Sequence, residues 1–295
     1  FNEAMYQWNS NAGASGLYLM SRSATLRHYS SNYPEDDGIN RIYRVNIGTD
    51  DYVGETTSYW NNSAPSILIS ADINLNTYYD FANSAQPNKF DVWSVFLHET
   101  GHVAGLGHTS DSNCVKHKIS FPNTTKRYLT TNDILGLKSI YGNQTTLSLG
   151  DDYYSNVEIN GNNIEYISGT MVEYDLNKMI EKSNVVVRAT LIEKSAPFEI
   201  DPVFGDTTEV FTDYSFLIQE ALKGELDKND IVSVRMKGGS TNDRTVIVED
   251  NPKINMNDSV VLCLYKPDMG TGYNTEGNYY YLRGLNQGAF TVQGN

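Results

Sequence analysis

Eleven residues, from His98 to His108, constrain this chain more than any other feature. Histidines occupy positions 98, 102 and 108, Glu99 follows the first of them, and Gly105 stands between the last two. On an α-helix, residues four apart lie on one face, so His98 and His102 can present ring nitrogens to one metal ion. Glycine adopts left-handed backbone conformations readily, so Gly105 can turn the chain and bring His108 round as a third ligand.

Three protein ligands leave one coordination position open, which is typical of a catalytic zinc rather than a structural one. Glu99 lies beside the ligands, where its carboxylate can accept a proton from a polarised water molecule. The alternative is that these are ordinary surface or core histidines, but three of the chain's five histidines fall on this one pattern. The sequence therefore predicts zinc held by His98, His102 and His108, with Glu99 as the general base.

The surrounding residues predict an α+β domain. A helix should begin after Asp91, a suitable N-cap, and end at Gly105, and a second should run from about Asn132, capped by Thr131, to Gly142. Short apolar runs bounded by polar loops predict strands at 17–20, 42–45, 66–69 and 73–75. The expected fold is a sheet accompanied by an active-site helix and a C-terminal helix.

The composition changes after residue 142. Residues 143–165 are rich in Asn, Asp, Gly and Ser, which is typical of a linker or a wrapping arm. A helix is then predicted at 175–183, followed by strands at 184–192, 213–220, 230–236, 244–248, 259–265 and 279–282. These strands indicate a small, mainly antiparallel barrel or sandwich. We therefore expect a first domain at 1–142, a linker at 143–165 and a β-rich domain at 166–295.

Charge and composition limit the partners. The formal net charge is −14, which argues against nucleic acid or an anionic membrane surface, because both attract basic faces. No apolar run approaches the length of a membrane span. Cys114 and Cys263 are too few for a disulfide scaffold, and isolated thiols are favoured over a single bridge. The chain contains no signal peptide and opens on a helix-like run, so segments upstream are expected to lie outside this sequence.

The histidine pattern matches the HExxHxxGxxH signature of the metzincin metallopeptidases, and its context resembles the matrixin branch and its bacterial relatives in particular. The flanking runs FDVWSVFL at 90–97 and LTTNDILGL at 129–137 are similar to matrixin sequences, as is SADINLN at 70–76. The resemblance covers about residues 1–142. It implies a twisted mixed sheet, one catalytic zinc, a peptide or protein substrate and an extracellular location.

The resemblance also implies a mode of substrate binding. Matrixins have an exposed edge strand that pairs with extended peptides, and by position this strand would be 52–57. The same strand could equally be an edge with no such role. A calcium ion is also possible, with oxygen ligands from Asp50, Asp51, Asp72 and Asp80, although solvated acidic loops explain these residues as well.

The chain departs from the matrixin pattern at Lys116, which stands where that family places a methionine beneath the metal. A lysine there requires that its stem turn the amine to solvent, that the turn follow another path, or that the zinc site be weakened. His117 next to it could steady an oxyanion or serve as an extra ligand. It could also be a loop histidine that lines the specificity pocket or faces solvent.

Runs at 184–190 and 214–224 resemble strands of netrin-like domains, a group that includes the tissue inhibitors of metalloproteinases and has an OB-like barrel fold. Those inhibitors use an N-terminal cysteine that this chain lacks, so their mechanism does not carry over. The second domain could bind substrate or a surface, restrain the cleft through an intramolecular contact, or stabilise the first domain. The sequence thus predicts a secreted zinc-dependent endopeptidase. The alternatives are a zinc-binding pseudopeptidase or binding protein, a self-restrained enzyme, and a zinc-stabilised structural module.

Overall fold

The computed structural model describes seven parts of the chain: residues 2–11, 38–48, 52–61, 68–141, 163–200, 208–266 and 278–292. These residues fall into two compact units. Of the described residues, the first unit contains 2–11, 38–47, 52–61, 68–141 and 166–172, and the second contains 48, 163–165, 173–200, 208–266 and 278–292. The predicted strand at 17–20 and the predicted helix end at Gly142 lie outside the described residues.

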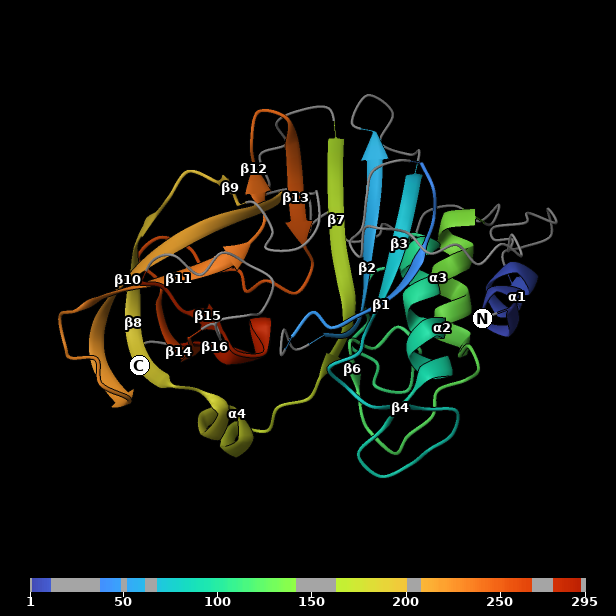
Figure 1. The fold of residues 1–295 in the computed structure, drawn as a ribbon, viewed down its shortest axis with the longest axis horizontal. Helices are drawn as coiled ribbons and strands as arrows, with labels where there is room; N and C mark the ends of the chain where they lie inside the picture. Colours follow the sequence, from blue (N-terminus) through green and yellow to red (C-terminus); the bar gives the residue numbers. More distant parts are fainter. Residues whose placement is uncertain are drawn as a thin grey trace. The chain divides into compact units, whose positions relative to one another are not determined.

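A mixed sheet forms the framework of the first unit (Figure 1). Its strands lie in the order β1-β3-β2-β7. β1 is parallel to β3, β3 is antiparallel to β2, and β6 pairs in parallel with β7. The bounds are β1 Ile42–Val45, β2 Tyr52–Asn61, β3 Leu68–Asn76, β6 Ile119–Ser120 and β7 Asn163–Val172, with a small separate pair, β4 Phe81–Ala82 and β5 Phe90–Asp91. The described part of the strand predicted at 66–69 and the strand predicted at 73–75 are one continuous strand, β3.

Helix α2 (Val92–Val103) packs against β2 and β3 of this sheet. It begins where the sequence predicts, because the side chain of Asp91 accepts a hydrogen bond from the Ser94 amide at 3.0 Å and so caps the helix. The helix ends just before Gly105, whose φ of 83° is left-handed. The predicted active-site helix is therefore confirmed at both ends.

Helices α1 (Asn2–Asn11) and α3 (Thr131–Tyr141) complete the first unit. α1 packs against α2 and α3, and the fully buried Trp8 donates its indole hydrogen to the carbonyl of Leu97 at 3.0 Å. α3 begins one residue earlier than expected. Its cap is Thr130 rather than Thr131, because the Asp133 carboxylate accepts from the Thr130 amide while the Asp133 amide donates to the Thr130 hydroxyl.

The second unit contains helix α4 (Leu176–Lys182), which Asp175 caps, and an antiparallel sheet in the order β11-β10-β8-β14-β15. β9 pairs with β10, and β16 pairs with β14. β12 and β13, which follow β11 in the sequence, form a short antiparallel pair. A 3₁₀-helix at Leu285–Gly288 precedes β16. The strand bounds are β8 Val185–Lys194, β9 Phe198–Ile200, β10 Glu209–Lys223, β11 Ile231–Lys237, β12 Gly239–Ser240, β13 Arg244–Val248, β14 Ser259–Tyr265, β15 Tyr281–Leu282 and β16 Ala289–Thr291.

The antiparallel character of this sheet agrees with the sequence, but the predicted OB-like barrel is not supported. Among the described residues the ladder ends at β11 and β15, and one isolated bridge connects Val234 of β11 with Tyr280, the residue before β15. Strand β15 has two residues, too short to extend that bridge into a ladder. The sheet is therefore curved around its apolar core without forming a closed barrel.

The structure also bears on the predictions for the cysteines, for membrane spans and for the linker. Cys114 and Cys263 are both free and buried, as predicted. No helix in the described parts of the chain is long and apolar enough to cross a membrane. The run predicted as a linker gives way to regular structure before its expected end, because residues 163–165 already belong to strand β7.

Candidate metal centre

Helix α2 and the turn after it bring the three motif histidines together. The Gly105 amide donates to the His102 carbonyl at 2.8 Å and the Leu106 amide to the Gly101 carbonyl at 3.0 Å, so the chain reverses directly beneath the helix end. His98 and His102 are buried, and His108 is partly buried. The sequence argument for one convergent cluster is matched by the geometry.

The ring nitrogens of the three histidines point at one another. The Nε2 atom of His98 lies 3.0 Å from Nε2 of His102 and 3.1 Å from Nε2 of His108. Ligands placed about 2.0–2.1 Å from one tetrahedral ion would be separated by about 3.3 Å, close to these values. Among the described residues, these three form the one group of His, Cys, Asp and Glu side chains arranged so that they could hold a metal ion.

The hydrogen bonds of His98 fit a metal ligand. Its Nδ1 atom lies 2.7 Å from the carbonyl oxygen of Val115, a position that requires Nδ1 to carry the proton. In the neutral ring, Nε2 then presents a lone pair to the other two histidines, which is the tautomer that metal binding needs. A cation among three such nitrogens satisfies them better than hydrogen bonds between the rings.

Burial also favours the neutral form of the rings. Desolvation lowers the pKa of His98 and of His102 well below the usual histidine value, and the neighbouring Lys116 cation lowers both further. An imidazole must be neutral to bind a metal, so the form that burial favours in His98 and His102 is the form that can be a ligand.

Glu99 is fully buried, and its carboxylate accepts hydrogen bonds from two strands of the sheet. Its Oε2 atom accepts from the Thr56 hydroxyl at 2.7 Å. Its Oε1 atom accepts from the amide of Thr170 at 3.0 Å and from the hydroxyl of Thr170 at 2.7 Å. Desolvation raises the pKa of Glu99, against the opposing effects of Lys116 and these hydrogen bonds.

Thr170 belongs to β7, and its presence corrects the prediction that 52–57 is an edge strand. β2 lies between β3 and β7, so neither of its sides is open in the described sheet. The approach of β7 is very close, because a Cβ atom added to Gly169 would lie 2.3 Å from the carbonyl oxygen of Gly54. Neither Thr56 nor Thr170 was predicted as part of the site, since nothing in the local sequence marks them.

Lys116 lies beneath the cluster, as its place in the sequence implied, but its amine does not turn to solvent. The side chain is buried and Nζ donates to the carbonyl oxygen of His98 at 3.1 Å. The turn is fixed from the other side by Asp133, whose carboxylate accepts from the amides of Val115 and Lys116 at 3.0 and 3.1 Å. A buried lysine therefore lies beneath the three histidines, in a turn that hydrogen bonds to Asp133 hold.

His117 is partly buried and lines a small cavity beside His98, together with Val95, Ile119 and Thr170. Its Nδ1 atom lies 3.3 Å from the Ile119 carbonyl, and burial lowers its pKa. This position agrees with a loop histidine that lines a pocket, and it does not join the ligand cluster.

The two calcium candidates that the structure describes, Asp72 and Asp80, belong to no group of potential metal ligands in the described part of the chain. Asp72 is fully buried and its carboxylate accepts from the backbone amide of Arg41 at 2.8 Å. Asp50 and Asp51 lie outside the described residues. His28, which has no predicted role, lies outside them too.

Comparison with known proteins matches this region of the chain. Residues 49–142 match the matrixin family model. Metalloendoproteinase 1 of Glycine max is 40% identical over 63 residues, which are 21% of this chain and 21% of the relative. Metalloendoproteinase 1-MMP of Arabidopsis thaliana is 34% identical over 88 residues, 29% of this chain and 24% of the relative.

The matched segments span about a quarter or less of these relatives' own length. No solved structure matches the chain. The family match ends at residue 142, so the predicted netrin-like character of the second half has no support from it. Residues 49–142, which contain the three-histidine cluster and Glu99, are therefore similar in sequence to the matrixin family.

Proposed function

We propose that this protein is a zinc-dependent endopeptidase in which His98, His102 and His108 bind the metal and Glu99 is the general base. The strongest support is that the Nε2 atoms of the three histidines converge. Glu99 lies on helix α2 with two of them, His98 and His102. A structural zinc site would have four protein ligands, and among the described residues no fourth candidate joins the cluster.

Each residue has a distinct part in hydrolysis. The three imidazoles would hold a zinc ion, which would supply Lewis acidity toward the substrate carbonyl and the attacking water. Glu99 accepts the proton from that water as its oxygen attacks the carbonyl carbon. When the carbon–nitrogen bond breaks, Glu99 returns the proton to the departing amine. The carbonyl oxygen of Val115 fixes the tautomer of His98 by accepting a hydrogen bond from its Nδ1–H group.

A comparison of the parent chain with Glu99→Gln tests the proposal. Both should bind about one zinc ion per chain, because the amide replaces a group that is not a ligand. Only the parent should cleave an unbiased peptide library, since the amide cannot take a proton. Equal cleavage by the two chains would exclude Glu99 as the base.

A pseudopeptidase or binding protein that holds zinc without useful turnover is the second candidate. The buried Lys116 favours it, because a cation beneath the site weakens the attraction for a dication. Zinc binding without cleavage, in a chain whose Glu99 is accessible to solvent, would support this candidate.

The setting of the enzyme follows from the same resemblance. We propose an extracellular location and a peptide or protein substrate, as the matrixin match implies. The second half could bind substrate or a surface, or could stabilise the first half. A netrin-like relationship for it is an expectation from sequence alone.

A further inference from the structure

We propose that residues 166–172, on strand β7, occupy the position of an extended peptide substrate and hold the site in a masked form. This proposal rests on the proposed function, since it explains how such an active site would be kept inactive. It concerns a segment within the first unit and the hydrogen bonds that this segment makes there.

The segment lies beside β2, and its last two residues also pair on the other side with β6, as an extended peptide in a cleft would pair with both walls. β2 lies on one side of it in the sheet. On the other side, β6 pairs with it in parallel, with Ile119 beside Met171, and the Met171 amide donates to the Lys118 carbonyl at 2.7 Å. Main-chain pairing of this kind is how sheet edges bind extended peptides, because it needs no particular side chains.

The segment also covers the catalytic group. The Glu99 carboxylate accepts three hydrogen bonds, two of them from the amide and hydroxyl of Thr170, and Glu99 has no exposed surface. The side chain of Thr170 lines the cavity beside His98 and His117. A water molecule therefore reaches Glu99 only when Thr170 moves away, which leaves the parent chain slow rather than inactive.

Two glycines permit this close fit. A Cβ atom at Gly54 would lie 2.9 Å from Oε1 of Glu99, and one at Gly169 would lie 2.3 Å from the Gly54 carbonyl oxygen. Contacts below 3.0 Å with backbone atoms force a shift, so any larger residue at 169 would push the segment away from β2. The segment is therefore sensitive to a single methyl group.

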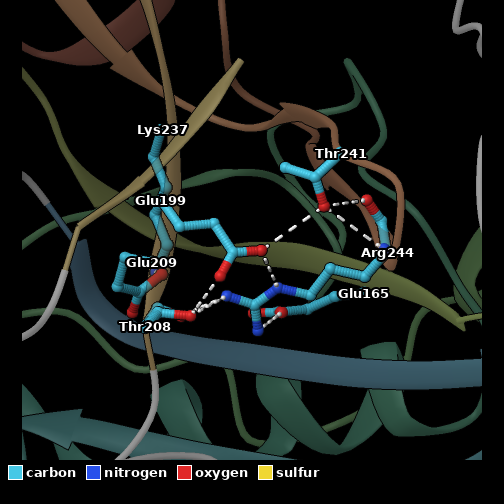
Figure 2. Close-up of polar contacts among 7 residues, drawn as sticks. All are labelled: Glu165, Glu199, Thr208, Glu209, Lys237, Thr241 and Arg244. Carbon is cyan, nitrogen blue, oxygen red and sulfur yellow. Dashed lines mark hydrogen bonds and ion pairs between the residues drawn. The ribbon is translucent and has the colours of Figure 1, made fainter.

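An ion-pair network in the second unit holds the beginning of the same strand (Figure 2). Glu165 directly precedes the segment, and the Arg244 guanidinium lies 3.4 Å from its carboxylate. Arg244 also lies 3.8 Å from the Glu199 carboxylate and donates to the backbone carbonyl of Thr208. Since β7 is continuous, loosening this network removes one support of the masking segment.

The test compares peptide cleavage by the zinc-loaded parent chain and by Gly169→Val. The variant should cleave at least tenfold faster, and hydrogen exchange should show faster exchange of the Thr170 and Met171 amides. A synthetic peptide with the sequence of residues 165–173 should return the rate of the variant toward that of the parent.

Gly224→Ala is the matched control, because it adds a Cβ atom 2.9 Å from a backbone carbonyl in the second unit. Its cleavage rate per folded chain should equal the parent's.

Arg244→Gln supplies a second test if Gly169→Val does not fold, since it weakens the support of the segment without placing an atom beside β2. Its expected cleavage rate is several times that of the parent. Equal rates in the parent and a folded variant whose 166–172 amides exchange faster would overturn the masking proposal and leave the peptidase standing. No cleavage by any of these chains, with zinc bound and the segment exchanging freely, would overturn the peptidase proposal and masking with it.

Discussion

Thr170 donates two hydrogen bonds to Glu99, from its amide at 3.0 Å and from its hydroxyl at 2.7 Å. The two residues are 71 positions apart in sequence, and both are buried. Thr170→Val keeps the shape of the side chain and removes the hydroxyl donor. Because the acceptor is a buried carboxylate, the variant should lose about 1.5–3 kcal/mol of unfolding free energy, measured by urea denaturation.

Thr124→Val is the control for this substitution. The Thr124 hydroxyl donates to the Phe121 carbonyl on the exposed surface, so its loss should cost about 0.5 kcal/mol or less. Equal losses in the two variants would mean that the Thr170 hydroxyl does not serve the buried carboxylate.

Zinc should stabilise the folded chain through the three histidines. Because the ligands converge only in the folded state, zinc at about 100 times its dissociation constant should add about 2.7 kcal/mol of stability. Thermal denaturation with and without a chelator measures this difference. His102→Ala should abolish the zinc-dependent rise in Tm, whereas His117→Ala should retain it. A rise that survives His102→Ala would place the metal elsewhere.

The buried amine of Lys116 should weaken zinc binding, because Nζ lies against the His98 carbonyl rather than in solvent. Lys116→Met removes the positive charge and keeps a side chain of similar length. The expected result is a zinc affinity at least tenfold higher, measured by competition with a chelating dye. Lys138→Met, on the exposed face of α3, should leave the affinity unchanged. An unchanged affinity in Lys116→Met would contradict the expectation that this side chain weakens zinc binding.

Asp91 should make the first unit sensitive to acid. Burial raises the pKa of this carboxyl, but hydrogen bonds from Arg127 and Ser94 outweigh burial and lower it overall. A lowered folded-state pKa gives stability that is present above the ordinary value of about 3.9 and is lost as pH falls through the folded value. Asp91→Asn should therefore be less stable than the parent at pH 7, by about 1–3 kcal/mol, since it also weakens the helix cap.

Urea denaturation at pH steps from 7 to 3 measures this effect. The difference between parent and Asp91→Asn should narrow as pH falls below about 4, because protonation removes the charge that the variant lacks. A difference that stays constant over this range would mean that the ion pair of Asp91 with Arg127 adds nothing.

The parts of the site that could be predicted are those encoded by short-range spacing. The four-residue step from His98 to His102 fixes a shared helix face, Asp91 precedes the helix as an N-cap, and Gly105 allows the turn. These relations depend on neighbouring residues, so one sequence suffices to read them. The longer strands of the second unit were predictable for the same reason, because apolar runs bounded by turn residues are local features, whereas the short strands β9, β12 and β16 were not predicted.

The parts that could not be predicted depend on pairing between distant segments. Nothing in residues 166–172 marks them as partners of β2, because main-chain pairing has no side-chain code. The edge strand expected at 52–57 became an interior strand for this reason. The path of Lys116 was equally hidden, because a long flexible side chain can reach solvent or a buried carbonyl with the same sequence.

Peptide cleavage in the unmasked chain tests the central claim most directly. Gly169→Val is compared with the double variant Gly169→Val, Glu99→Gln, both loaded with zinc. The account predicts that the double variant keeps its zinc and cleaves at least about 100-fold more slowly, the usual contribution of a general base. Equal cleavage rates in the two chains would contradict it, because Glu99 would then have no part in the chemistry.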